Sequence, residues 1–108
     1  MAITTIESVD DFIKLQKSNS HVIVDFHAVW CAPCKAMAPF FQMHADELAP
    51  RGVAFAKVDV DVVPELAAQY RVTTIPTFFF IKDGQPIDEV RSATPNKLKE
   101  AFARLQLQ

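Results

Sequence analysis

The feature that most constrains the fold is a pair of cysteines, Cys31 and Cys34, at the junction between a strand pattern and a helix pattern. Residues 22–26 read Val-Ile-Val-Asp-Phe, an almost continuous apolar run that is typical of a central strand covered on both faces. From Pro33 to about Leu48 the apolar residues repeat at helical spacing. A strand that leads directly into a helix through Cys-x-x-Cys indicates one unit of an α/β fold.

Strand and helix patterns alternate along the rest of the chain. Each strand is a short run rich in apolar residues, and each helix repeats its apolar positions three or four residues apart. Asp83-Gly84 is a typical hairpin turn, which makes the last two strands antiparallel. The expected strands are 3–6, 22–26, 53–58, 77–81 and 87–90. The expected helices run from Ser8 to about 18, from Pro33 to about 48, from 62 to 70, and from Thr94 to about Leu105. Asp61 is expected to cap the third of these helices. This order predicts an α/β domain with a partly parallel sheet.

The length, apolar content and charge of the chain indicate a single domain and exclude some kinds of partner. The chain has 108 residues, half of them apolar, and a net charge of −2. This length predicts one domain over residues 1–108, with a core that needs no disulfide to hold it together. The interspersed charges predict neither a nucleic-acid partner nor a membrane surface, and we expect a monomer. The first residues show no secretory signal pattern, so we expect the reducing cytoplasm, where close cysteines are more often catalytic or metal-binding than structural.

A thiol pair at the start of a helix has the chemistry for disulfide exchange. Only the thiolate is nucleophilic, and a second thiol within reach is needed to resolve the mixed disulfide. The free N–H groups at the helix N-terminus favour an anion on Cys31, and Lys35 adds positive charge. We therefore expect a lowered pKa and partial exposure for Cys31, and a buried, less acidic Cys34.

Two other interpretations of the pair stay open on these residues alone. A lone Cys-x-x-Cys is half of a structural zinc site, for which His27 and His44 are the nearest further ligands, without the spacing of a zinc finger. Two buried cysteines without redox activity would also fit a core. The strand-to-helix context favours redox chemistry over both, with no metal bound.

Asp25 interrupts the apolar run before the cysteines. A carboxylate in a strand covered on both faces loses hydration, so burial raises its pKa unless a partner compensates. With a raised pKa, Asp25 can accept a proton from Cys34 near neutral pH, directly or through water. The alternative is a carboxylate at a strand end that is bonded to backbone. Lys57 is expected to neighbour Asp25, or else to be a solvated lysine at an edge of the sheet.

Taken together, these residues resemble the thioredoxin family. The segment Trp30-Cys31-Ala32-Pro33-Cys34-Lys35, preceded by Val24-Asp25-Phe26, is similar to the family's active-site segment, and Ile75-Pro76-Thr77 is similar to its cis-proline loop. The similarity runs from about Phe12 to Leu105. It implies the thioredoxin fold, a central five-stranded mixed β-sheet flanked by four α-helices.

The resemblance also implies an activity and a set of site residues. A protein of this kind reduces protein disulfides through its two cysteines, binds no cofactor, and is itself reduced by a thioredoxin reductase that uses NADPH. By resemblance, the catalytic residues are Cys31, Cys34, Asp25 and Lys57. The surface for disulfide-containing protein substrates is implied at Trp30, Ala32, Pro33, Thr74, Ile75, Pro76, Ser92 and Ala93, with a cis Ile75–Pro76 bond. Plain packing is the alternative role for Trp30.

Two positions depart from the family pattern. Ala32 stands where glycine is commonest, and alanine favours a stiffer first helical turn. Ser92 stands where the family has glycine, and together with Arg91 it adds a side chain and a charge at the rim of the site. Two other functions stay open: a redox-inactive binding or chaperone-like subunit with this fold, and an oxidase or isomerase of an oxidising compartment.

Overall fold

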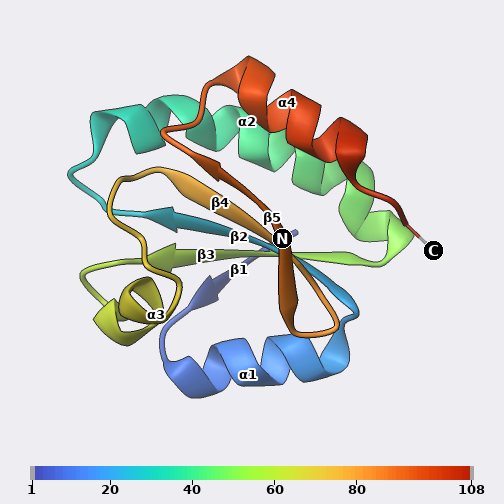
Figure 1. The fold of residues 1–108 in the computed structure, drawn as a ribbon, viewed down its shortest axis with the longest axis horizontal. Coiled ribbons are helices and arrows are strands. Elements are labelled where there is room, and N and C mark those ends of the chain that lie inside the picture. Colours follow the sequence, from blue (N-terminus) through green and yellow to red (C-terminus); the bar gives the residue numbers. More distant parts are fainter. Residues whose placement is uncertain (1, 108) are drawn as a thin grey trace.

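The computed structural model describes residues 2–107 and contains a sheet with helices on both faces (Figure 1). The strands are β1 (Ile3–Ile6), β2 (His21–His27), β3 (Val53–Asp59), β4 (Thr77–Lys82) and β5 (Gln85–Arg91). The helices are α1 (Val9–Ser18), α2 (Ala32–Leu48), α3 (Pro64–Gln69) and α4 (Pro95–Arg104), with a short 3₁₀ helix η1 (Ala49–Arg51). Over the described residues, the five strands and four α-helices confirm the predicted fold class.

The strands lie in the order β1-β3-β2-β4-β5. Both β1 and β2 run parallel to β3, whereas β4 is antiparallel to β2 and to β5. The β4–β5 hairpin turns at Asp83 and Gly84, whose φ angles of 49° and 79° match the positive values that a two-residue hairpin turn requires. Because β2 is the central strand, the residues that follow it leave from the middle of the sheet.

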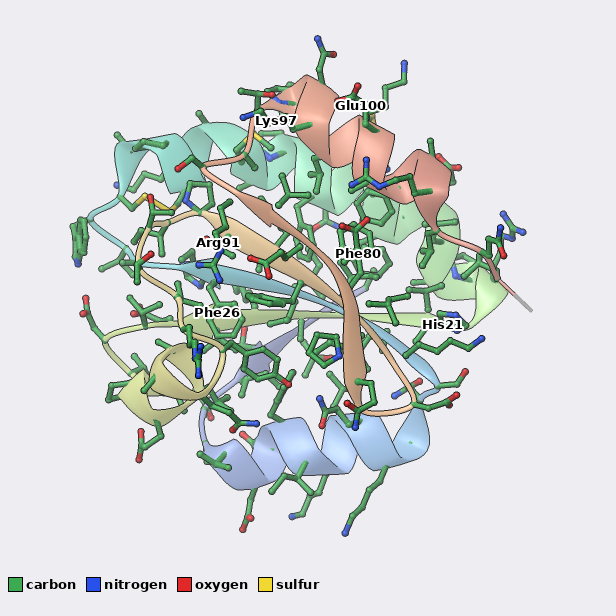
Figure 2. All side chains as sticks on the ribbon, in the orientation of Figure 1. His21, Phe26, Phe80, Arg91, Lys97 and Glu100 are labelled. Carbon is green, nitrogen blue, oxygen red and sulfur yellow. A yellow bond between two sulfur atoms is a disulfide. The ribbon has the colours of Figure 1, made fainter. Side chains whose placement is uncertain are left out.

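Apolar side chains form a core on each face of the sheet. Helices α2 and α4 cover one face, and α1 and α3 cover the other (Figure 1). Phe80 belongs to the first core and Phe26 to the second, on opposite sides of the sheet (Figure 2). Successive residues of β2 alternate between the two cores, and Ile23 packs on the α2 side. Asp25, two residues further along β2, therefore faces α2 as well.

The predicted and observed bounds differ most near prolines. Strand β5 begins at Gln85, two residues earlier than predicted, because Pro86 is accommodated in this edge strand beside an irregularity in the β4–β5 register. Helix α3 begins at Pro64, and the preceding Val63 provides no side-chain cap. The predicted capping of this helix by Asp61 is therefore wrong, and the Asp61 carboxylate has another partner, described below.

Candidate active site

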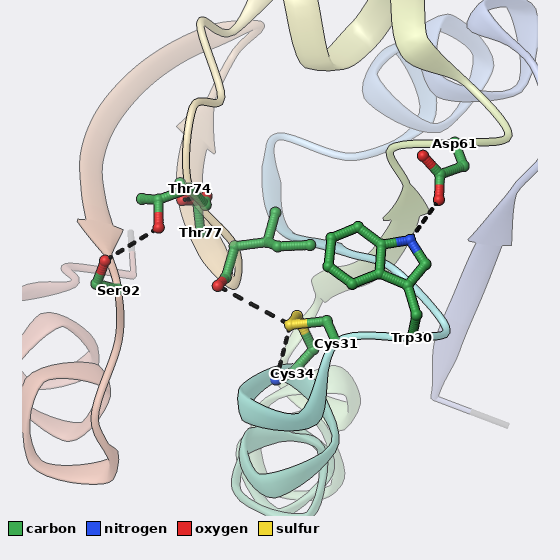
Figure 3. The surroundings of a disulfide bond; sticks show 8 residues. Trp30, Cys31, Cys34, Asp61, Thr74, Thr77 and Ser92 are labelled. Carbon is green, nitrogen blue, oxygen red and sulfur yellow. Dashed lines mark hydrogen bonds between the residues drawn. A yellow bond between two sulfur atoms is a disulfide. The ribbon is translucent and has the colours of Figure 1, made fainter.

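The two cysteines lie where the central strand β2 is followed by α2 (Figure 3). Cys31 is the N-cap residue of α2, and its Sγ accepts a hydrogen bond from the backbone N–H of Cys34 at 3.2 Å. The two side chains form a disulfide, with their Cα atoms 5.2 Å apart. The sulfur of Cys31 is thus held at the positive end of a 17-residue helix, where negative charge is stabilised.

Both cysteines are buried in this disulfide form. The exposed fraction is 4% for Cys31 and 5% for Cys34, because Ala28, Val60 and Ile75 pack around the pair. The expected partial exposure of Cys31 is therefore wrong for the oxidised state, whereas the burial of Cys34 is confirmed. The two cysteines are about equally buried in this form and differ in their position on α2, with Cys31 at its N-cap and Cys34 one turn further in.

The loop that precedes β4 lies against the disulfide. The carbonyl oxygen of Ile75 is 3.9 Å from the Sγ of Cys31, and the Ile75–Pro76 peptide bond is cis. The buried Thr77 hydroxyl donates a hydrogen bond to the Thr74 carbonyl oxygen at 2.6 Å, which fixes the end of the loop to the start of β4. The backbone of Ile75 is therefore close enough to the cysteines to contact a chain that binds there.

Trp30 stands beside the disulfide with its side chain largely in solvent. Its exposed fraction is 67%, which leaves little core packing for this residue. The indole Nε1–H donates a hydrogen bond of 2.7 Å to Oδ2 of Asp61, in the loop after β3 (Figure 3). Sequence reasoning missed this role of Asp61, since nothing in the local pattern pairs residues 31 positions apart.

Two more exposed apolar residues accompany this contact. Val29 precedes Trp30 and is 69% exposed, and Val62 follows Asp61 and is 59% exposed. The Trp30–Asp61 hydrogen bond brings these two short segments together beside the cysteines. Three exposed apolar side chains, Val29, Trp30 and Val62, therefore lie on the two segments that this hydrogen bond joins. Sequence reasoning assigned no role to Val29 and placed Val62 only as the start of a helix.

Asp25 is buried without a full set of hydrogen bonds. It lies inside β2 rather than at its end, is 7% exposed, and its Oδ1 has no hydrogen-bond partner. Burial raises the pKa of Asp25 to about 7, and the positive charge of Lys57 opposes this rise. Lys57 is the register partner of Asp25 in β3, so the predicted neighbourhood of the two residues is confirmed. A carboxyl group with this pKa can both hold and release a proton at neutral pH.

The remaining predicted site residues lie at the edge of this region. Ala32 and Pro33 are exposed in the first turn of α2. Ser92 has a φ of 50°, in the left-handed region that favours glycine, and its Oγ lies 3.2 Å from Oγ1 of Thr74. Ala93 is half-buried and packs against the core under α2 and α4, so its side chain is turned partly inward.

The described residues contain neither a cluster of metal ligands nor a membrane-spanning helix. Within residues 2–107, no three side chains of His, Cys, Asp or Glu are grouped as metal ligands, so this part of the chain offers the zinc hypothesis no ligand set. Over the same residues, no helix has both the length and the apolar character required to cross a bilayer.

A disulfide at a helix N-terminus differs chemically from one that only ties a fold together. Once it is reduced, the sulfur at the N-cap is stabilised as a thiolate, and the second sulfur one turn away can close the bond again. A pair built in this way can exchange electrons with other disulfides. The class of protein that this fold and site define is therefore a thiol–disulfide oxidoreductase.

Comparisons with known proteins agree with this class. The thioredoxin family model matches residues 3–104. The thioredoxin of Coprinus comatus is 37% identical over 97 residues, which cover 90% of this chain and 92% of that protein. A structure of Plasmodium falciparum thioredoxin superposes with a TM-score of 0.88 at 34% identity, covering 95% of this chain and 99% of the other. The oxidized form of mitochondrial thioredoxin 3 from Saccharomyces cerevisiae gives 0.86 at 36% identity, with 96% of each chain covered.

The chain therefore belongs to the thioredoxin family. Its activity is that of a protein-disulfide reductase, and the redox-inactive alternative is not favoured. Thioredoxins carry no bound cofactor, so the redox group is the disulfide of the chain itself.

Proposed function

We propose that the protein reduces disulfides in other proteins with Cys31 as the attacking thiolate and Cys34 as the resolving thiol. The observation that carries this assignment is the 3.2 Å hydrogen bond from the Cys34 N–H to the Cys31 Sγ at the N-terminus of α2. After reduction, the same N–H and the helix dipole stabilise negative charge on Cys31. Cys34 lies one turn further into the helix, where this effect is weaker.

The proposed reaction has two exchange steps. The Cys31 thiolate attacks one sulfur of the substrate disulfide, a new S–S bond forms, and the other substrate sulfur leaves as a thiolate that takes up a proton. Cys34 then loses its proton and attacks the Sγ of Cys31, which releases the second substrate thiol. The substrate disulfide has gained two electrons and two protons, and the chain is left with the Cys31–Cys34 disulfide.

Asp25 is the proposed acceptor for the proton of Cys34. Its carboxyl group faces α2, is almost fully buried, and has a pKa of about 7, which suits proton transfer near neutral pH. Lys57, its register partner in β3, limits the rise of that pKa by its positive charge. In this proposal, Lys57 acts on the reaction by tuning the proton acceptor.

Asp25→Asn is expected to slow the second exchange step, on the order of tenfold or more, because the amide cannot take up the proton. The measurement is the release of a substrate peptide from a preformed mixed disulfide at pH 7, followed by rapid mixing and acid quench. The rate of the first step, attack by Cys31 on a substrate disulfide, is measured in a separate experiment and serves as the control. Release at the wild-type rate would remove Asp25 from the mechanism.

The proposed substrate surface surrounds the disulfide. It combines the exposed Trp30 with the exposed first turn at Ala32 and Pro33, and with the half-buried Thr74 and Ile75 of the loop before β4. Pro76 belongs to the same loop, but it is buried, so its contribution would be to shape the loop. Ser92 and Ala93 form its far rim. An extended substrate chain would lie along the Ile75 backbone, whose carbonyl oxygen is 3.9 Å from the attacking sulfur.

A turnover assay tests the proposed function. The reduced protein should accelerate insulin reduction by dithiothreitol, seen as precipitation of the free B chain, and a thioredoxin reductase with NADPH should replace the dithiothreitol. No acceleration with either reductant would contradict the proposal. A redox potential well above the range of disulfide reductants, near −120 to −180 mV, would favour an oxidase or isomerase instead.

We also propose the compartment and the oligomeric state in which the protein works. A dithiol reductant must be kept reduced, so we place it in the cytoplasm, as one domain that acts as a monomer. A mitochondrial relative of similar fold makes the organelle the competing compartment. Cell fractionation and light scattering of the purified protein test these two points.

A further inference from the structure

The loop between α3 and β4, residues 71–76, is held from one side by the end of β5. The guanidinium of Arg91, the last residue of β5, donates a hydrogen bond from a terminal nitrogen to the carbonyl oxygen of Arg71 at 2.9 Å. The next residue, Ser92, places its Oγ 3.2 Å from Oγ1 of Thr74. Two consecutive side chains therefore contact the loop at Arg71 and at Thr74, just before the Ile75–Pro76 bond.

Arg91 is itself fixed in place by two further contacts. Its Nε forms an ion pair with Oε2 of Glu89, on the same face of β5, and its guanidinium carbon lies 5.8 Å from the centre of the Phe79 ring. A guanidinium is planar with several N–H donors, so one arginine can bind Glu89 and the Arg71 carbonyl at once while resting near an aromatic ring. Such an arrangement restricts the side chain to one orientation, over Phe79 on the side of the sheet that α1 and α3 cover (Arg91 is labelled in Figure 2).

The backbone is unusual at Arg71, where the loop begins, and at Ser92, which follows β5. Arg71 and Ser92 have φ angles of 53° and 50°, a region that disfavours residues with a side chain. Residues 71–76 also lie outside the helices and strands, so this loop lacks the hydrogen-bond ladder that fixes β4 and β5. The Val72 N–H bonds to the Ala67 carbonyl and the Thr77 hydroxyl bonds to the Thr74 carbonyl, which ties the loop to α3 and to β4. The Arg91 and Ser92 contacts add a support from β5.

We propose that Arg91 is a positioning residue for disulfide exchange with protein substrates, and that the Ser92–Thr74 hydroxyl contact assists it. This inference rests on the proposed function. Arg91 does not reach the sulfurs; it fixes the loop whose Ile75 carbonyl oxygen lies 3.9 Å from Cys31 and along which an extended substrate would bind. A small disulfide has no peptide backbone to pair with Ile75, so its reduction depends less on the position of this loop. The Arg91 contacts therefore select for peptide substrates.

The test compares two substrates with Arg91→Met and Arg91→Lys. We expect the ratio of kcat/KM for insulin to kcat/KM for bis(2-hydroxyethyl) disulfide, a small neutral disulfide, to fall on the order of fivefold in both variants, mainly through KM for insulin. Lysine should not rescue the ratio, because an ammonium group lacks the planar fork that binds two acceptors. The matched control is Arg104→Met, which removes the Arg104–Asp88 ion pair at another point of β5 and should leave the ratio unchanged.

A second pair of variants tests the contact between the Ser92 and Thr74 hydroxyl groups. Ser92→Ala and Thr74→Val should each lower the same ratio, on the order of threefold, and the double variant should lower it no further, because both remove one interaction. Ser18→Ala, an exposed serine at the end of α1, is the control.

Several results would overturn the inference. One is an unchanged ratio in Arg91→Met, and another is an equal loss of activity toward both substrates. Full rescue by Arg91→Lys would mean that charge, and not the fixed geometry, matters. Thermal unfolding of each variant separates loss of fold from loss of positioning, since a merely structural role would not change the ratio. If the wild-type protein reduces neither substrate, the proposed function fails and not this inference.

Discussion

Cys31→Ser is expected to lower insulin-disulfide reduction by at least about a thousandfold, to the rate of the reductant alone. A serine hydroxyl at the N-cap of α2 is not ionised at neutral pH and does not exchange with disulfides, although it can still accept the Cys34 N–H that the sulfur now accepts. The fold should therefore persist while the activity is lost. Circular dichroism and thermal unfolding of the reduced proteins provide the control for folding.

Cys34→Ser should fail in a different way. Its Cys31 can still attack, but no second thiol is present to resolve the intermediate, so a stable one-to-one mixed disulfide should accumulate. Electrophoresis without reductant, followed by release with dithiothreitol, detects this species. The variant that lacks both sulfurs should form none. If that double variant kept a full effect on a partner protein, the chain would act as a binding subunit rather than as an enzyme.

Asp25→Asn is expected to make the folded protein more stable than the wild type at pH 8, by between about 2 and 4 kcal/mol. Burial raises the pKa of Asp25 from 3.8 to about 7. Ionisation of Asp25 is therefore less favourable in the folded state than in the unfolded state, and this difference lowers the stability of the wild type at pH 8. Each tenfold change in acid strength corresponds to about 1.4 kcal/mol, which gives about 4 kcal/mol as the upper value. The partly unsatisfied amide of asparagine lowers that gain.

The pH dependence of this difference has a defined sign. Below about pH 4, Asp25 is protonated in both the folded and the unfolded state, so the variant gains nothing there and should be less stable than the wild type by the cost of the asparagine amide. Between about pH 4 and pH 7, the folded wild type keeps a proton that the unfolded chain releases, so its stability falls relative to the variant as pH rises. Above about pH 7 the difference should be constant.

Urea unfolding of the oxidised proteins at pH 4, 6 and 8 measures this trend. Asp46→Asn is the matched control, because Asp46 is exposed on the outer side of α2; its effect should stay within about 0.5 kcal/mol. A stability difference between Asp25→Asn and the wild type that does not grow with pH would show that the carboxyl group ionises freely. Asp25 would then be unsuited to the proton-transfer role.

The fold could be predicted from the sequence because its signals are local. Continuous apolar runs marked the buried strands, and Asp83-Gly84 marked the hairpin, since each depends on neighbours along the chain. The same holds for Cys31. Its place at a helix N-terminus could be predicted because the continuous apolar run of a strand ends at residue 26 and apolar residues at helical spacing follow. The burial of Asp25 could also be predicted, because it interrupts such an apolar run.

What the sequence could not predict are contacts between distant segments. The partner of Trp30 is a carboxylate that local spacing assigned to a helix cap, and the fold alone brings the two together. Arg91 was expected only to add charge at the rim, yet its guanidinium binds the Arg71 carbonyl across the loop. The burial of Cys31 in the disulfide form likewise arises from Ile75 and Val60, which belong to other parts of the chain.

The structure explains what the serine at position 92 does where the family has glycine. The family's glycine at this position is consistent with the left-handed backbone found here, with a φ of 50°. A serine in the left-handed region has a higher conformational free energy than glycine. Its hydroxyl oxygen lies within hydrogen-bond distance of the Thr74 hydroxyl. The sequence alone shows the substitution, but not the residue that the new side chain reaches.

The most direct test of the central claim is a titration of the Cys31 thiol in the reduced Cys34→Ser variant, followed by thiolate absorbance at 240 nm. Because the Cys31 sulfur is held at the positive end of α2 and accepts a backbone N–H, its pKa should be at least about one unit below the ordinary thiol value of about 8.5. A pKa at or above about 8.5 would contradict the claim that this helix activates Cys31 for disulfide exchange.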